Sequence, residues 1–244
     1  MPEEIGATID NLNDLSEINY GDLKIFSGEW LGGEFDNLTI YISVAWSGWG
    51  KVSAARAATR LIGTSFRKRK IDLLIFTGVA GAANSSLKQW DLVVPSALVQ
   101  HDMDARPLFP KFVVPTLRTD KLNSIEKYSD WSVAVLSEAI SRGKLQKFGQ
   151  ISRGVIATGD RFISDKGLIN MLSDEIIDLC AVEMEGAAVA QVSHQEGIPW
   201  LILRVISDSA DESAAQTFSE FLQEYSKISW NLVETLMTKI KSII

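Results

Sequence analysis

Residues 181–186 read Ala-Val-Glu-Met-Glu-Gly, and residues 203–211 read Leu-Arg-Val-Ile-Ser-Asp-Ser-Ala-Asp. Each stretch continues an apolar run typical of a buried strand and then presents carboxylates, Glu185 in the first and Asp208 in the second. An alanine-rich helix pattern, residues 187–196, separates them. This alternation predicts parallel strands, and ligands of open α/β sheets collect outside the carboxyl ends of such strands. The two carboxylates therefore predict a site for a polar ligand.

The same alternation of strands and helices continues along the rest of the chain. Strand patterns occur at residues 23–29, 38–45, 71–76, 91–99, 154–158 and 200–206, and helix patterns at 51–62, 131–140 and 219–243. The small residues 77–83 predict a turn, and the proline-containing residues 101–116 predict a loop. The expected fold class is α/β, a single-domain αβα sandwich with a mixed central sheet that spans residues 1–244.

Charge and hydropathy exclude several classes of function. A net charge of −7 argues against a nucleic-acid partner, which would require a basic face. The local basic cluster at residues 67–70 is interpreted as a solvated helix end. The first residues lack the features of a secretory signal, and no apolar run reaches the roughly 18 residues that suggest a membrane span. We therefore expect a soluble, cytoplasmic protein that binds neither nucleic acid nor membrane.

Few residues are available for disulfides or metal sites. The single cysteine, Cys180, lies in an apolar run and is expected to be a core thiol. The two histidines, His101 and His194, are far apart in the sequence, which makes a histidine-based metal site improbable. We interpret His101-Asp102-Met103-Asp104 as a hydrogen-bonded loop or a subunit contact. No metal or other cofactor is expected.

The two carboxylates admit both functional and structural interpretations. Asp208 directly follows a buried run, and partial burial favours the protonated form that a general acid near neutral pH requires. A cap or turn role for Asp208 is an equal alternative. Glu183 and Glu185 share a face if the segment is extended, so that one of them can accept hydrogen bonds from vicinal hydroxyls. A glutamate that complements the N-terminus of a helix is the alternative.

Three other segments carry weaker signals. Gly78-Val79-Ala80-Gly81 offers bare backbone to a ligand. The segment Ser47–Lys51 resembles an anion-binding loop only loosely and lacks the P-loop pattern, so a tight turn before a helix is favoured. Phe162 and Phe218 are each interpreted either as aromatic residues that contact a planar ligand or as core residues.

As an ordered set, several segments resemble the 5′-methylthioadenosine/S-adenosylhomocysteine nucleosidases, which belong to the nucleoside phosphorylase superfamily. The segments are Met1–Glu4, Ser47–Val52, Thr77–Gly81, His101–Asp104, Thr158–Ile163, Val182–Glu185 and Arg204–Asp211. They span nearly the whole chain, and their order is more specific than any one of them. The resemblance implies a nucleoside phosphorylase-like fold and hydrolysis of the N-glycosidic bond of an adenine nucleoside, as a step of methionine salvage.

The resemblance also implies the roles of four catalytic residues. Asp208 would donate a proton to N7 of adenine, and Ser207 would orient Asp208. Glu4 would take the proton of the attacking water, which Arg204 would help to place. The ribose would pass through an oxocarbenium-like state.

Substrate-binding residues are implied in the same way. Glu185 would hold the ribose hydroxyls, with Met184 under the sugar. Phe162 would stack on adenine, the backbone of Ile163 would contact its edge, and Phe218 would border the 5′-thio group. Family members are usually homodimers, so residues 101–116 would line the neighbouring pocket, with Leu108, Phe109 and Pro115 as candidates.

The sequence departs from the family pattern at several positions. Many relatives carry a serine that helps to hold the water where Val79 stands, and Trp46 and Trp49 are bulkier than the usual residues of their turn. Family chains usually have a short apolar strand ahead of the segment that matches Met1–Glu4, and the present sequence starts after that strand. Either the gene start is placed late or the strand has been lost, and a loss would leave a strand position of the sheet empty.

Two alternatives to hydrolysis remain open from the sequence. A phosphorolytic purine nucleoside phosphorylase would require an anion pocket with arginines, and no arginine stands near the Ser47–Lys51 segment before Arg56. A nucleoside-binding protein of the same fold without turnover is the second alternative. The presence of Asp208 and Glu185 argues against it.

Overall fold

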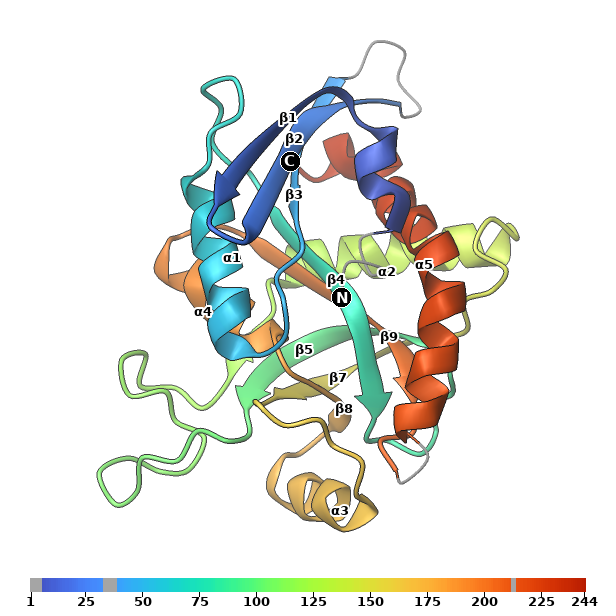
Figure 1. Ribbon diagram of the computed structural model, residues 1–244. Helices are drawn as coiled ribbons and strands as arrows, with labels where there is room; N and C mark the ends of the chain where they lie inside the picture. The colour runs from blue at the N-terminus through green and yellow to red at the C-terminus, as the bar shows by residue number, and fades with distance from the viewer. Residues whose placement is uncertain (1–5, 33–38, 212–213) are drawn as a thin grey trace.

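The most deeply buried strand is β9 (Trp200–Asp208), whose residues are all buried. The computed structural model describes residues 6–32, 39–211 and 214–244 (Figure 1). Along β9, Leu201, Leu203 and Val205 enter one core cluster, whereas Ile202 and Ile206 enter another. Burial on both faces is the arrangement that a continuous apolar run predicts for a strand inside a layered α/β protein.

The central sheet is mixed, as predicted. Its strands are β4 (Leu74–Ala82), β5 (Leu92–Gln100), β6 (Leu122–Asn123), β7 (Ile151–Thr158), β8 (Leu179–Glu183) and β9. The pairs β4–β9, β5–β7 and β7–β8 are parallel, whereas β4–β8, β5–β6 and β5–β9 are antiparallel. Because β5 also pairs with β9, the strands β5, β7, β8, β4 and β9 close into a ring. The ends of β4, β8 and β9 therefore meet.

Helices cover both faces of this sheet, which confirms the αβα arrangement (Figure 1). On one face α4 (Gly186–Gln195) packs against α1 (Lys51–Gly63) through small side chains such as Ala54, Ala58 and Ala188. On the other face lie α2 (Glu126–Ser141) and α5 (Ala214–Lys239). The short α3 (Lys166–Glu175) packs against β7 and β8. None of the described helices is long and apolar enough to cross a membrane.

The first three strands form a separate antiparallel sheet; the strand patterns at residues 23–29 and 38–45 predicted two of its strands but not their separation from the central sheet. Its strands are β1 (Asn13–Tyr20), β2 (Leu23–Leu31) and β3 (Thr39–Ala45), after the 3-10 helix η2 (Gly6–Asn11). The sheet packs on the last turns of α5 and on η3 (Ile240–Ser242) through Trp30, Trp230 and Met237. β1 was not predicted because its residues are polar or exposed along its whole length, so that it lacks the apolar pattern of a buried strand.

Several predicted boundaries need correction. The turn expected at residues 77–83 is mostly strand, because β4 continues to Ala82 beside β9. A β-carbon at Gly81 would lie 2.9 Å from Cβ of Ala210, so the small residue serves close packing there. Helix α2 and strand β7 begin earlier than expected, and α3 was missed. The loop at residues 101–116 is confirmed, and it projects from the body of the molecule (Figure 1).

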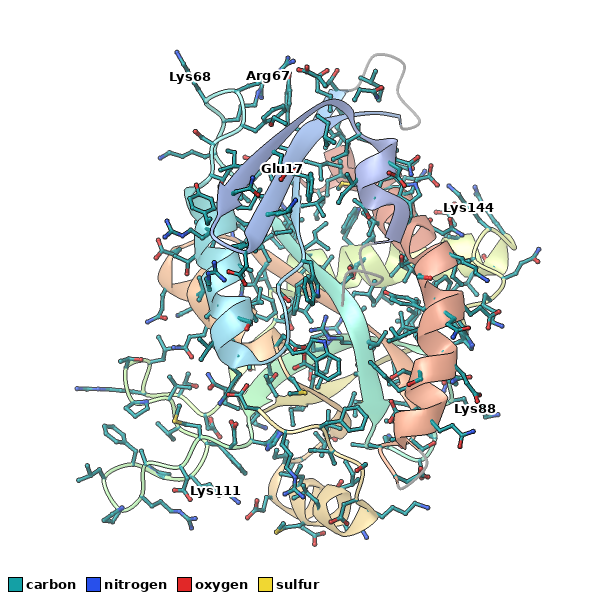
Figure 2. All side chains as sticks on the ribbon, in the orientation of Figure 1. Glu17, Arg67, Lys68, Lys88, Lys111 and Lys144 are labelled. Carbon is teal, nitrogen blue, oxygen red and sulfur yellow. The ribbon has the colours of Figure 1, made fainter. Side chains whose placement is uncertain are left out.

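The basic cluster at residues 67–70 also differs from its prediction. Helix α1 ends at Gly63, and the cluster lies in a turn closed by a bridge between Phe66 and Arg69. Arg67 and Lys68 adopt positive φ and are exposed at the surface (Figure 2). Arg67 forms ion pairs with Asp14 of β1 and Glu29 of β2. Part of the cluster therefore connects this turn to the three-stranded antiparallel sheet.

Ile202→Ala is expected to destabilise the protein by about 2–5 kcal/mol, because Ile202 is 1% exposed and its removal leaves a cavity beneath α4. Val52→Ala, at a side chain that is 81% exposed, should change the free energy of unfolding by less than about 0.5 kcal/mol. Chemical denaturation of both variants measures the difference. Equal stabilities would contradict the position of β9 in the core.

Candidate active site

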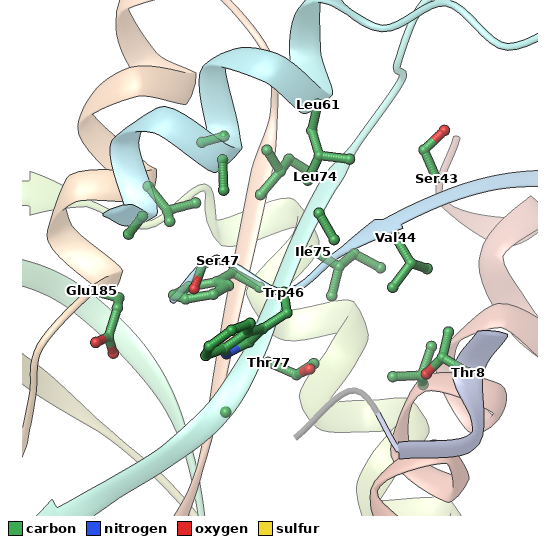
Figure 3. Close-up of a pocket in the computed structure, with 18 of the residues that line it drawn as sticks. Thr8, Ser43, Val44, Trp46, Ser47, Leu61, Leu74, Ile75, Thr77 and Glu185 are labelled. Carbon is green, nitrogen blue, oxygen red and sulfur yellow. The ribbon is translucent and has the colours of Figure 1, made fainter. Parts of the chain in front are cut away.

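Every predicted site residue in the described part of the chain lines one cavity of about 570 Å³. Glu4 lies outside the described residues. The cavity runs between α1, β3 and β4 (Figure 3), and residues at the ends of β8 and β9 also line it. The predicted residues that line it are Val79, Phe162, Ile163, Met184, Glu185, Arg204, Ser207, Asp208 and Phe218.

Asp208 is the last residue of β9, and its carboxylate is held at both oxygens. The hydroxyl of Ser207 donates to Oδ2 at 2.7 Å, and the backbone N–H of Ala210 donates to Oδ1 at 2.8 Å. Burial raises the pKa of Asp208, although these hydrogen bonds act in the opposite direction. The direction of this shift is the one expected for a half-buried carboxyl group, and the two hydrogen bonds fix the orientation of the carboxyl group.

Glu183 forms a buried ion pair with Arg204. Nη2 of Arg204 lies 2.6 Å from Oε2 of Glu183, and the two side chains are 1% and 2% exposed. Arg204 also stacks over the ring of Phe76, with its guanidinium carbon 4.2 Å from the ring centroid. Thr158 donates to the other carboxylate oxygen of Glu183 and accepts from the N–H of Ala187. The network joins β7, β8 and β9 to the start of α4.

The chain turns sharply after Glu183, so Glu183 and Glu185 do not share an extended face. Glu183 accepts hydrogen bonds from the backbone N–H groups of Glu185, at 3.0 Å, and of Gly186, at 2.7 Å. It therefore caps the N-terminus of α4, which is the structural role that the sequence left open for one of these glutamates. The side chain of Glu185 instead lines the cavity (Figure 3).

Glu185 has the most perturbed carboxyl group of the site. Burial raises its pKa to about 7, and the negative charge of Glu183 acts in the same direction. The backbone N–H of Gly50 donates to Oε1 at 2.8 Å, which connects Glu185 to the turn before α1. Glu185 is thus poised between its two protonation states near neutral pH.

The turn before α1 is held by the protein's own carboxylates. The N–H of Lys51 donates to Asp160 at 2.7 Å, and the Lys51 ammonium lies 2.5 Å from Asp102. Asp102 also accepts from the N–H of Asp160 at 2.9 Å. The start of this helix, a natural anion site, is therefore occupied by Glu185 and Asp160. Sequence reasoning missed Asp160, although the residue lies in a motif that it quoted.

Aromatic side chains line the mouth of the cavity. Phe218 contacts Phe162 edge to face, with ring centroids 5.9 Å apart, and Trp49 similarly at 6.2 Å. Phe162 is 38% exposed and Trp49 is 47% exposed, whereas Ile163 is buried. Phe162 and Phe218 are thus accessible to a planar ligand, which favours the functional interpretation over a core role.

The remaining polar candidates have structural positions. Asp104 pairs with Arg106 of its own loop at 2.5 Å, which agrees with the predicted loop network. His194 is exposed, and Cys180 is a buried free thiol. Within the described ranges, no group of three or more histidine, cysteine or acidic residues is arranged to hold a metal ion.

Glu185 should make stability depend on pH. Because its pKa is about 7 in the folded state and near 4.5 when unfolded, its contribution is fully present below pH 4.5 and is lost as the pH rises to about 7. The free energy of unfolding of the unmodified protein should therefore fall by roughly 3 kcal/mol between pH 4.5 and about 7, and Glu185→Gln should remove this decline. Denaturation of both proteins across this range measures it. Glu220→Gln, at an exposed position, is the control and should keep the decline. An unchanged decline in Glu185→Gln would contradict the raised pKa.

Glu183→Gln should destabilise the protein by about 3–5 kcal/mol, because it leaves the buried guanidinium of Arg204 without its counter-charge. The variant should also lower the pKa of Glu185, since the neighbouring negative charge is removed. Thermal unfolding and carboxyl-carbon NMR titration measure the two effects. The double variant Glu183→Gln/Arg204→Met should be more stable than Glu183→Gln alone. If it is not, the loss of the ion pair is not the cause of the destabilisation.

Comparison with known proteins agrees with this geometry. The model of the phosphorylase superfamily matches residues 1–238. The 5′-methylthioadenosine/S-adenosylhomocysteine nucleosidase of Geobacillus thermodenitrificans is 34% identical, over 99% of this chain and 95% of its own.

Two solved structures share the fold over nearly their whole length. One is the Neisseria meningitidis nucleosidase of that name in complex with methylthio-immucillin-A, with a TM-score of 0.81, 28% identity and coverage of 98% of this chain and 96% of its own. The other is the futalosine hydrolase of Helicobacter pylori, with a TM-score of 0.80, 31% identity and coverage of 98% and 94%. The chain therefore belongs to the phosphorylase superfamily and, within it, to the 5′-methylthioadenosine/S-adenosylhomocysteine nucleosidases.

Proposed function

We propose that this protein hydrolyses the N-glycosidic bond of 5′-methylthioadenosine and S-adenosylhomocysteine, releasing adenine and the 5-thioribose product. The observation that carries the proposal is the pair of carboxyl groups with raised pKa values, Asp208 and Glu185, in one cavity. The named relatives of this chain are nucleosidases for these two compounds. Water supplies the new bond to C1′ of the ribose as the bond to the base breaks.

Asp208 is proposed as the general acid. Its protonated form transfers a proton to N7 of adenine, so that the base leaves as a neutral molecule, which contributes about 10²–10⁴-fold to the rate. Ser207 and the N–H of Ala210 fix the carboxyl orientation. Burial raises the pKa of Asp208, which brings the carboxyl group closer to the range that a general acid requires.

The ribose is proposed to lie beside Glu185 and Met184. A carboxylate accepts two hydroxyl hydrogens at once, and its negative charge stabilises the developing cation on the sugar. Because the pKa of Glu185 is about 7, its carboxyl group carries a proton below that pH. The group then has to lose this proton before it can accept hydrogen bonds from two ligand hydroxyls. Gly50 fixes one oxygen of this side chain from the opposite side of the cavity.

The base and the 5′ group are proposed to contact the aromatic mouth. Phe162 stacks on adenine, the backbone of Ile163 contacts its edge, and Phe218 borders the 5′ substituent. The accessible rings of Phe162 and Trp49 suit planar and apolar ligand groups. Glu4 and Arg204 are proposed to activate and place the water, next to Val79. Arg204 is already oriented by Glu183.

Hydrolysis is favoured over phosphorolysis by the turn before α1. The N–H groups of Gly50 and Lys51, which are suited to hold an anion, donate to Glu185 and Asp160. The Lys51 ammonium is paired with Asp102. A phosphate at this position would have to displace two carboxylates of the protein, which is unfavourable.

Homodimerisation is proposed with residues 101–116 reaching the neighbouring site. Leu108 is 83% exposed on this projecting loop, which suits an apolar contact with a second copy. We also propose that the protein is located in the cytoplasm and that its reaction is a step of methionine salvage.

Futalosine is a second candidate substrate. The futalosine hydrolase that shares the fold is 31% identical, no more distant than several of the nucleosidases. The bulky rings of Trp46 and Trp49 line the cavity and Trp49 contacts Phe218, so a bulkier 5′ substituent would find aromatic partners there.

Asp208→Asn should abolish base release while nucleoside binding survives, because the amide keeps the shape but has no proton to donate. Free adenine from methylthioadenosine and S-adenosylhomocysteine is measured by chromatography, with and without phosphate, and calorimetry measures binding. The unmodified protein should release adenine without phosphate. Comparable turnover in Asp208→Asn would exclude it as the acid, and release only with phosphate would exclude hydrolysis. Faster release of the base from futalosine would favour the second substrate.

A further inference from the structure

The turn before α1, residues 47–50, is held from outside and not by a cap of its own. Gly48 and Gly50 adopt positive φ angles of 80° and 84°, a backbone conformation that glycine adopts more readily than other residues. Gly50 is the N-cap of α1, and glycine has no side chain to accept hydrogen bonds from the first N–H groups of a helix. These groups therefore depend on acceptors from elsewhere in the chain.

The segment that holds this turn is residues 158–160, which follow β7. Thr158 donates to the carboxylate of Glu183, and the N–H of Gly159 donates to the backbone oxygen of Glu183 at 3.1 Å. A β-carbon at Gly159 would overlap the ring of His101, so the imidazole packs directly on this segment. Residues 158–160 are therefore fixed to β8 and to the residue that follows β5.

Asp102 joins the turn to this segment through both of its carboxylate oxygens. Oδ1 lies 2.5 Å from the ammonium of Lys51, and Oδ2 accepts from the N–H of Asp160 at 2.9 Å. Asp160 in turn accepts from the N–H of Lys51 at 2.7 Å, which closes a ring of three residues. The side chains of Lys51 and Asp102 are 18% and 33% exposed, so solvent screens their attraction less than that of a fully exposed pair.

The three residues of this ring are not among those that line the described cavity, but two of them adjoin residues that contact it. Gly50, directly before Lys51, donates its N–H to Oε1 of Glu185 at 2.8 Å. Phe162, two residues after Asp160, lines the cavity. The ring therefore sets the position of the proposed ribose contact relative to the proposed base contact.

We infer that Asp102 is a positioning residue for the proposed reaction. Through Lys51 and Asp160 it holds the N–H of Gly50 against Glu185, and it thereby orients the carboxylate that is proposed to bind the ribose hydroxyls. The inference rests on the proposed function. A ring that only added stability to the fold would leave the carboxyl group of Glu185 unaffected when Asp102 is replaced.

Glu185 is sensitive to the position of this N–H. Burial raises its pKa to about 7 and the charge of Glu183 acts in the same direction, whereas Arg204 and the N–H of Gly50 lower it. Among the described residues, Gly50 supplies the one hydrogen bond that the Glu185 carboxyl group receives. If the turn moves away, the ionised form loses this donor and the pKa of Glu185 should rise.

The sign of the change separates positioning from a direct effect of charge. Replacement of Asp102 by alanine removes a negative charge and leaves the ammonium of Lys51 without this partner. Both effects favour the ionised form of Glu185, so that charge alone would lower its pKa. A rise can result only from a change in the position of the hydrogen-bond donor or in burial.

The first measurement is a carboxyl-carbon NMR titration of the full chain without substrate. In Asp102→Ala the pKa of Glu185 should rise by about one pH unit, the size expected for the loss of one hydrogen bond to the ionised form. The value of kcat/KM for 5′-methylthioadenosine, measured from adenine release, should then fall at least about fivefold at pH 7, because less Glu185 is ionised. The difference from the unmodified protein should shrink as the pH rises.

A matched control and a second variant complete the test. Asp130→Ala, which breaks an exposed ion pair with Arg153, should leave both the pKa of Glu185 and kcat/KM unchanged. Lys51→Met should reproduce the fall in kcat/KM, and Asp102→Ala/Lys51→Met should be no worse than either single variant, because the two residues act through one contact. If Asp102→Ala does not fold, as judged by thermal unfolding, Lys51→Met alone decides.

Two outcomes would overturn the inference. One is an unchanged or lowered pKa of Glu185 in folded Asp102→Ala, and the other is a double variant in which the two losses of kcat/KM multiply. Because the NMR titration requires no substrate, it decides the position of Glu185 even if the unmodified protein releases no adenine. Failure of the proposed function is therefore distinguishable from failure of this inference.

Discussion

The ion pair between Glu183 and Arg204 is the constraint on which the rest of the site depends. A buried ion pair adds little net stability compared with apolar side chains of the same volume, but it permits few alternative arrangements of its partners. Glu183 satisfies Arg204 on β9, Thr158 on β7 and the first N–H groups of α4 at once. The ends of three strands and one helix are thereby fixed relative to each other, which sets where Glu185 and Asp208 lie.

The same arrangement gives the three acids different surroundings. Glu183 contacts the guanidinium of Arg204 and accepts hydrogen bonds from the N–H groups of Glu185 and Gly186. Its charge and the surrounding burial raise the pKa of Glu185, which has one N–H donor from Gly50. Burial raises the pKa of Asp208, whose neighbours are a hydroxyl and an N–H. An acid that gives up a proton and a carboxylate that accepts hydroxyls can thus work side by side.

Much of the fold and site could be predicted from the sequence, because continuous apolar runs mark buried strands regardless of context. The strands that contain Leu203 and Val182 were found for that reason, and so were the carboxylates that follow them. β1 was missed since its side chains make few core contacts. Residues 77–82 were mistaken for a turn because small residues also permit close strand packing, which only the neighbouring Ala210 reveals. The sequence could not show which glutamate caps α4. That depends on a bend of the chain after Glu183, and the spacing of apolar residues gives no sign of such a bend.

Strands β3 and β4 both border the catalytic cavity, so the positions of these strands affect its geometry. The residues that follow β3, Trp46 to Gly50, form one wall of the catalytic end and hold Glu185 through the Gly50 N–H. The end of β4, at Gly81, lies against Asp208. The distance between the two strands therefore contributes to the distance between the two carboxyl groups. Since catalysis requires positions accurate to a fraction of an ångström, a change in the distance between the two strands would affect turnover more than ground-state binding.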